Sequence, residues 1–226
     1  MKLTFLGHSS ILIEVSGHRL LFDPFITPNP LASKVEITSL RPDFVLLTHA
    51  HGDHVADAET ILKYSGATLI SNYEIVTWYG AKGLTHGHPL NHGGAFNFPF
   101  GRVKYVNAVH SSSFPDGSYG GNAGGFVIET PEGTFYVSGD TALTYDMKLI
   151  ADRYQLEFAV LPIGDNFTMG PDDAAIAAEW CGAKRVVGVH YDTFPPIVID
   201  KDAAKATFAA NGVELLLPAI GETIGL

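Results

Sequence analysis

The sequence contains very little cysteine and little positive charge. Cys181 is the single cysteine among 226 residues, which excludes an internal disulfide framework and suits a reducing compartment. Lysine and arginine number 14 against 24 aspartates and glutamates, and the net charge is −10. This charge argues against non-specific binding to nucleic acid or to an anionic membrane. We therefore expect a small-molecule substrate, with neither nucleic acid nor membrane as a partner.

Long apolar segments are also missing, and no leader peptide is expected. No run of about 18 apolar residues occurs, so no transmembrane helix is predicted. Residues 1–5 enter an expected strand at once, without the charged, apolar and small-residue regions of a signal peptide. These features predict a cytoplasmic protein, and they leave a homo-oligomer open.

The chain does contain enough apolar material for a core. Hydrophobic residues make up 46% of the sequence, and 226 residues suit one compact domain that spans 1–226. Cys181 falls in an alanine-rich predicted helix, so we expect it to pack in the core rather than to react.

Strands come first along the chain and then alternate with helices, which is typical of an α/β protein. Glycine- and proline-rich stretches at 83–94 and 111–123 are expected to be irregular, and the second is long enough to be a functional loop. The predicted strands are 3–6, 11–15, 19–22, 44–47, 67–71, 95–99, 102–109, 126–129, 134–138, 158–161, 185–189 and 213–217. The predicted helices are 54–65, 72–81, 145–153, a helix that begins at Pro171, and 201–211.

A dense cluster of metal-binding residue types follows the predicted strand 44–47. The segment His49-Ala50-His51-Gly52-Asp53-His54 holds three histidines and one aspartate. Imidazole nitrogens and carboxylate oxygens are ligands that zinc, manganese, iron and nickel accept. His49 and His51 are two residues apart, whereas Asp53 and His54 are adjacent. One loop can therefore direct one pair to a first metal ion and the other pair to a second.

Three later strands also end near a metal-binding residue: His110, Asp140 and His190. In sheets flanked by helices, ligands gather at one end of the strands, so these side chains should meet the histidine loop. We assign His49, His51 and His110 to one ion, assign Asp53, His54 and His190 to another, and let the two oxygens of Asp140 bridge them. The expected cofactor is two divalent ions per chain, zinc first, with manganese, nickel or iron as alternatives. Such a pair activates water as a nucleophile at neutral pH.

This constellation resembles the metallo-β-lactamase superfamily over the whole chain. More narrowly, Gly7-His8-Ser9-Ser10 and the segments 164–171 and 190–195 resemble a bacterial and archaeal branch of metal-dependent hydrolases that is similar to the L-ascorbate-6-phosphate lactonases. The resemblance implies an αβ/βα four-layer sandwich, in which two mixed β-sheets are flanked by helices and the metals lie at one edge.

Two residues are candidates for catalysis beyond metal binding. Asp53 could orient the nucleophilic water and later carry its proton. His8 is interpreted either as a core or surface histidine or as a functional residue, and its His-Ser-Ser setting and the resemblance are the arguments for the second. Asp23, at the end of a predicted strand, is either a turn residue or an acceptor for the free N–H of a ligand histidine.

Candidate substrate contacts lie in the loops. Asp165 and Asn166 either cap a loop or bind substrate, and Asn122 could close over the site together with Tyr119. His86 and His88 are interpreted as loop residues, because neither is expected at a strand end.

The predicted function is that of a dinuclear metal-dependent hydrolase, in which a metal-bridging hydroxide attacks a lactone, ester or phosphoester. The two ions, two carboxylates and one hydroxide leave a formal charge of about +1, which favours a small anionic substrate. The alternative is a phosphodiesterase or nuclease that acts on nucleic acid or nucleotides. An iron redox protein and a non-catalytic metal-binding module are two further hypotheses.

Overall fold

Two mixed β-sheets of seven strands each lie at the centre of the computed structural model, which describes residues 1–226. The first sheet has the order β14-β1-β2-β3-β4-β5-β6. Strands β14, β1, β2 and β3 are antiparallel, whereas β3 to β6 run parallel. Its strands are β1 (Lys2–Gly7), β2 (Ser10–Val15), β3 (His18–Phe22), β4 (Phe44–Leu46), β5 (Thr68–Asn72), β6 (Gly87–Leu90) and β14 (Thr223–Gly225).

The second sheet repeats this division, with the order β13-β12-β11-β10-β9-β8-β7. Strands β7 to β10 are antiparallel, and β10 to β13 are parallel. Its strands are β7 (Ala95–Phe98), β8 (Gly101–Asn107), β9 (Gly124–Thr130), β10 (Gly133–Val137), β11 (Leu156–Pro162), β12 (Arg185–Val189) and β13 (Glu214–Leu216).

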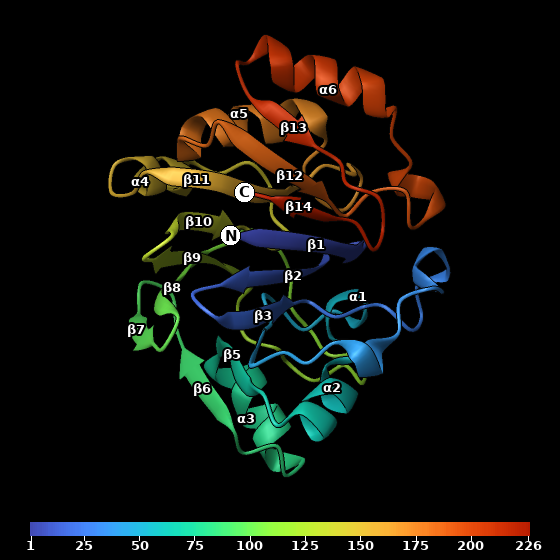
Figure 1. Cartoon of the computed structure of the whole chain (residues 1–226), viewed down its shortest axis with the longest axis vertical. Coiled ribbons are helices and arrows are strands. Elements are labelled where there is room, and N and C mark those ends of the chain that lie inside the picture. The colour runs from blue at the N-terminus through green and yellow to red at the C-terminus, as the bar shows by residue number, and fades with distance from the viewer.

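Helices cover the outer face of each sheet, so the molecule has the expected four layers (Figure 1). The first sheet carries α1 (Gly52–Val55), α2 (Ala58–Ser65) and α3 (Tyr73–Ala81). The second carries α4 (Lys148–Ala151), α5 (Pro171–Cys181) and α6 (Lys201–Ala210). Short 3-10 turns occur at Pro30–Ala32, Ile37–Ser39, Tyr145–Met147 and Pro195–Ile197. None of the helices combines the length and the apolar character needed to cross a membrane.

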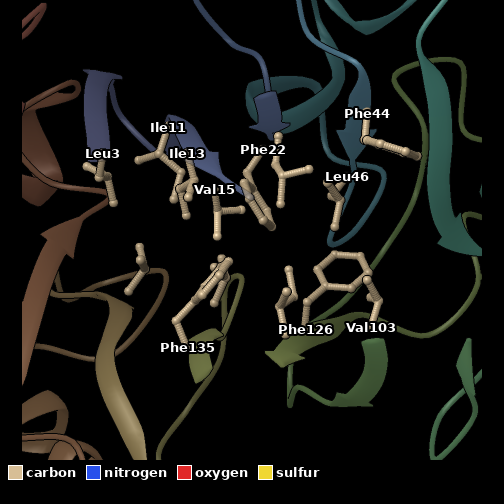
Figure 2. Close-up of a cluster of buried hydrophobic side chains, with 14 of the residues drawn as sticks. Leu3, Ile11, Ile13, Val15, Phe22, Phe44, Leu46, Val103, Phe126 and Phe135 are labelled. Atoms are coloured by element: carbon tan, nitrogen blue, oxygen red, sulfur yellow. The ribbon is translucent and has the colours of Figure 1, made fainter. Parts of the chain in front are cut away.

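The main core lies between the two sheets. Figure 2 shows Leu3, Ile13 and Phe22 of the first sheet opposite Phe126 and Phe135 of the second. Successive side chains of a strand point to opposite faces of the sheet. In β2, this alternation places Ile11, Ile13 and Val15 in the core between the sheets and Leu12 in the cluster under the helices. Cys181 is buried in the separate cluster under α5 and α6, in agreement with a packing role.

The predicted strands agree with the observed ones within two residues at each end, but two strands were missed. The stretch 83–94 contains β6, and its His88 packs on Phe96 with ring centroids 4.0 Å apart. Its interpretation as a loop residue was wrong, because an edge strand tolerates the glycine and proline that flank His88. The other missed strand, β14, has three residues and pairs with β1 at the sheet edge.

The single helix predicted over 54–65 is instead two helices, α1 and α2. The break falls at Asp57, whose carboxylate accepts hydrogen bonds from the backbone N–H groups of Ile26 and Thr27 at 2.7 and 2.8 Å. A distant segment therefore interrupts the helix. The helix predicted over 145–153 is a 3-10 turn followed by the four-residue α4.

Candidate metal centre

Four loops at the ends of strands bring the predicted ligands to one edge of the sandwich. The loop after β4 carries His49 to His54, and β8, β10 and β12 lead to His110, Asp140 and His190. Helix α1 begins directly after His51, and the N–H of His54 donates to the carbonyl of His51 at 2.9 Å. His190 has a positive φ of 58°, and its N–H donates to the carbonyl of His8 at 2.9 Å. This hydrogen bond ties the two sheets together at the site.

The first group of candidate ligands is His49, His51 and His110, as the spacing predicted. Their ligand nitrogens lie within 4.8 Å of one another. Nε2 of His49 is 3.1 Å from Nδ1 of His51, so these two atoms face the same point. His49 is fully buried, whereas His51 and His110 are partly exposed toward solvent.

The second group contains the predicted Asp53, His54 and His190, and His8 in addition. His8 is buried, with Nε2 at 3.1 Å from Oδ2 of Asp53 and Nδ1 at 3.0 Å from Oγ1 of Thr193. Because a carboxylate only accepts, Nε2 of His8 must be the donor. His8 therefore lies inside the site and holds one oxygen of Asp53.

Asp140 lies between the two groups. Its Oδ2 is 3.0 Å from Nε2 of His190 and 3.2 Å from Nε2 of His54. The same oxygen is 3.7 Å from Nε2 of His110 and 3.9 Å from Nε2 of His49. The sequence interpretation gave each group its own oxygen, but one oxygen faces histidines of both.

Two buried atoms at this point have no hydrogen-bond partner in the protein. They are Nε2 of His54 and Oδ1 of Asp140. An unpaired buried polar atom costs roughly 1–3 kcal/mol, so native proteins rarely keep one without a reason. Divalent cations at the two groups would supply the missing partners. The residues present therefore fit two metal ions.

A buried hydrogen-bond network fixes which nitrogens face the centre. Oδ2 of Asp23 accepts from Nδ1 of His54 at 2.9 Å and from the hydroxyl of Thr48 at 2.7 Å. The Thr48 oxygen, having donated its hydrogen, can accept from Nδ1 of His49 at 3.0 Å. Both imidazoles thus carry hydrogen on Nδ1 and direct Nε2 toward the centre. Asp23 occupies the place expected for a carboxylate that orients ligand histidines.

The two groups differ in their electrostatics. Burial lowers the pKa of His49 well below its ordinary value, and it also lowers the pKa of His51 and His110. Burial acts in the same direction on His54 and His190, but the neighbouring carboxylates outweigh it. The pKa of His54 is raised well above its ordinary value, and that of His190 rises to about 9.

The two carboxylates of the centre are held ionised. Burial would raise the pKa of Asp140, but His54 and His190 lower it far below its usual range. Burial would also raise the pKa of Asp53, but Nε2 of His190, 3.7 Å from Oδ2, and the hydrogen bond from His8 lower it below its usual range. Burial lowers the pKa of His8 to about 4, so this imidazole is neutral at pH 7. Asp53 and Asp140 are therefore available as anionic ligands.

A cavity of about 450 Å³ opens onto the centre. Phe167, Phe194 and Pro196 form its apolar walls, and Ser111 adds a hydroxyl 3.3 Å from Nε2 of His51. No lysine or arginine lines the cavity, and its remaining lining residues are His51, Asp53, His110, Asp140 and His190.

Three residues predicted to contact substrate do not line this cavity. Asn122 is exposed, and its carbonyl accepts from the Asn72 amide at 3.2 Å, so the end of the loop 111–123 is bound to β5. Asp165 and Asn166 both have positive φ and form an exposed turn, closed by a hydrogen bond from the N–H of Asp165 to the carbonyl of Met169. These interactions place them outside the lining.

Sequence reasoning gave no role to Thr48, Ser111, Thr193, Phe167 or Phe194. Thr48 adjoins the ligand motif and Ser111 follows His110, so proximity was the available signal. Thr193, Phe167 and Phe194 lie in the segments 164–171 and 190–195 that carried the resemblance, but nothing in those segments indicated which side chains face the cavity.

The chain was compared with known families and structures. The model of a family described as "Beta-lactamase superfamily domain" matches residues 18–191. A "UPF0173 metal-dependent hydrolase" of Flavobacterium johnsoniae is 54% identical over 226 residues, and the match covers 100% of both chains.

Two solved structures share the fold. Igni18, a metallo hydrolase from Ignicoccus hospitalis, is 34% identical with a TM-score of 0.90, and the match covers 99% of this chain and 97% of that one. An isothiocyanate hydrolase from Delia radicum gut bacteria is 20% identical with a TM-score of 0.81, covering 100% and 99% of the two chains. At that identity the second similarity supports the fold alone.

Proposed function

Because this chain belongs to the metallo-β-lactamase superfamily and is a metal-dependent hydrolase, we propose that it hydrolyses a small molecule at a centre of two divalent ions. One observation carries the proposal: Oδ2 of Asp140 lies 3.0–3.9 Å from histidine nitrogens of both ligand groups. His49, His51 and His110 would hold one ion, Asp53, His54 and His190 the other, and Asp140 both. Zinc suits this ligand set, and manganese, nickel and iron accept it too.

Divalent ions held by these residues would supply a metal-activated water as nucleophile and would polarise the bond under attack. The chain supplies orientation and proton transfer. Asp53 is partly exposed to the cavity and is ionised, so its carboxylate can receive a proton from water. His8 holds Oδ2 of Asp53 at 3.1 Å, and it is a positioning residue in this proposal.

The reacting bond in this proposal is that of a lactone, ester or phosphoester. Its carbonyl or phosphoryl oxygen gains negative charge during the reaction, and a cationic centre stabilises that charge. Since no lysine or arginine lines the cavity, a negative group on the substrate would have to contact the centre itself. If its negative group contacts the centre, an anionic sugar-acid substrate fits the cavity, and the proposal therefore includes a lactonase-like activity.

The alternative of a phosphodiesterase acting on nucleic acid has weaker support. A polynucleotide needs cations along its backbone, but the chain has a net charge of −10 and the cavity lining has no basic residue. Small-molecule hydrolysis therefore fits the site better.

A panel of chromogenic esters, lactones, thioesters and phosphodiesters tests the proposal. Each substrate is assayed with protein loaded with zinc, manganese or nickel, and we expect turnover in at least one carbonyl class. His110→Ala should abolish that turnover. His18→Ala, at a partly exposed histidine of the β2–β3 hairpin, is the matched control and should leave it unchanged. No turnover with any metal would overturn the proposal.

A further inference from the structure

We propose that Phe167 and Phe194 form a subsite for a flat apolar group, such as an aryl ring, carried by the substrate. This inference rests on the proposed hydrolysis, because the subsite opens onto the same metal centre. It assigns an uncharged, flat apolar character to the part of the substrate that lies between the two rings, and any negative group then contacts the centre itself.

Phe167 stands on a rigid turn beside the centre. The N–H of Asp165 donates to the carbonyl of Met169 at 3.0 Å and closes this turn. Met169 is buried, and its N–H donates to the carbonyl of Thr141, the residue after Asp140, at 3.2 Å. The backbone of the turn is therefore tied to the segment that carries Asp140, and the Phe167 side chain is 54% exposed.

Phe194 stands on the turn that follows the next parallel strand, β12. Its ring packs on His8 and Phe25, with centroids 5.4 and 6.1 Å away. The turn is closed by a hydrogen bond of 2.8 Å from the N–H of Asp192 to the carbonyl of Ile197, and Lys201 pairs with Asp192 at 2.9 Å. The ring of Phe194 thus packs on His8, the residue whose Nε2 also donates to Asp53.

The two turns are packed against each other. A Cβ added to Gly164, just after β11, would lie 2.0 Å from the carbonyl oxygen of His190. Only glycine allows this close approach of the backbones. Because both turns leave neighbouring parallel strands at the same edge, their aromatic side chains reach the same cavity.

The chemistry of the walls selects the ligand. Rings pack best against flat apolar groups, and water around the exposed face of Phe167 would be released when such a group binds. A phosphate or carboxylate placed between these walls would lose its hydration and find no lysine or arginine. The cavity of about 450 Å³ has room for a ring together with the reacting group.

Two matched hydroxamates test the subsite without any need for turnover. Benzohydroxamate and acetohydroxamate present the same metal-binding group and differ in the ring. With the metal-loaded protein we expect benzohydroxamate to bind about tenfold more tightly by calorimetry, since one well-packed apolar group is worth about that factor or more. Phe167→Ala and Phe194→Ala should each reduce the preference. Phe96→Ala, which alters an exposed phenylalanine on the distant strand β7, should keep it.

A matched pair of phenyl-substituted and methyl-substituted lactones or esters separates this inference from the proposed function. Higher kcat/KM for the phenyl member, lost in Phe167→Ala with unchanged metal content, supports the subsite. Turnover without a phenyl preference, or equal binding of the two hydroxamates, overturns the subsite and leaves the hydrolase proposal standing. A hydroxamate preference in a protein that hydrolyses nothing overturns the proposed function and keeps the subsite.

Discussion

The carboxylate of Asp23 accepts a hydrogen bond from Nδ1 of His54 at 2.9 Å, and Nε2 of His54 consequently faces Asp140 at 3.2 Å. The same carboxylate reaches His49 through the hydroxyl of Thr48. One buried acid therefore orients a histidine of each ligand group. The orientation of both candidate ligand groups therefore depends on a residue that belongs to neither group.

Asp23→Asn should weaken metal binding while the protein stays folded. Oδ2 of Asp23 accepts from His54 and the Thr48 hydroxyl, and Oδ1 accepts from the Thr48 backbone N–H at 2.8 Å. An amide has only one acceptor oxygen, so it cannot keep all three bonds, and the histidines lose their fixed orientation. Loss of such a partner typically costs about 10–100-fold in affinity. Metal content after dialysis at graded free-metal concentrations measures the effect. Asp152→Asn, at an exposed aspartate, is the control, and equal affinity in the Asp23 variant and the unaltered protein would contradict the role.

Removing one ligand from each group should remove one ion at a time. His110→Ala is expected to lose the first ion and His190→Ala the second, with activity reduced by orders of magnitude in both. Asp140→Asn should impair both sites, because its Oδ2 faces both groups. Elemental analysis of protein reloaded with excess metal gives the stoichiometry. A ceiling of one ion in the unaltered chain would eliminate the second site.

The ligand cluster could be predicted because its signals are local and its residue types are specific. His49, His51, Asp53 and His54 lie within six residues, and His110, Asp140 and His190 each follow an apolar strand. Parallel strands that end at one edge then bring distant residues together without any further information. The structure brings the seven side chains into neighbouring groups, and Oδ2 of Asp140 faces histidines of both.

Contacts set by tertiary packing could not be predicted in this way. Thr193 meets His8 across 185 residues of chain, and no pattern in either segment specifies that meeting. The break between α1 and α2 depends on backbone N–H groups of Ile26 and Thr27, which lie 30 residues before it. The hydrogen bond from the Asn72 amide to the carbonyl of Asn122, across 50 residues of chain, is another contact of this kind.

Asp53→Asn should reduce turnover more than it reduces metal content. The amide keeps the shape of the side chain and one oxygen, but it cannot take a proton, and proton transfer of this kind contributes about 10²–10⁴-fold. His8→Ala should reproduce part of the loss, because it frees the oxygen that Nε2 of His8 holds at 3.1 Å. Parallel measurements of kcat and bound metal decide the matter. If turnover and metal fall together, Asp53 is only a ligand.

The two ligand groups should release different numbers of protons when they bind metal. In the metal-free protein, burial lowers the pKa of His49, His51 and His110, so these imidazoles are already neutral at pH 7.5 and an ion displaces no proton. Burial is outweighed by Asp140 and Asp53 at His190, whose pKa rises to about 9, and the pKa of His54 is raised as well. Between its ordinary pKa of about 6.5 and a pH of about 9, His190 holds a proton that an ion must displace, and the raised pKa of His54 acts in the same direction.

The metal affinity of the second group, which contains His54 and His190, should therefore increase as the pH rises toward 9. The metal affinity of the first group should change little above pH 7. Calorimetry in buffers of different ionisation enthalpy counts the protons. His190→Ala retains the first group, and its binding of zinc at pH 7.5 should release close to none. His110→Ala retains the second group and should release about one to two, because the charges on His54 and His190 are coupled through Asp140. Equal release from the two variants would mean that the carboxylates do not hold these histidines protonated, and the assignment of Asp140 as their shared partner would have to be abandoned.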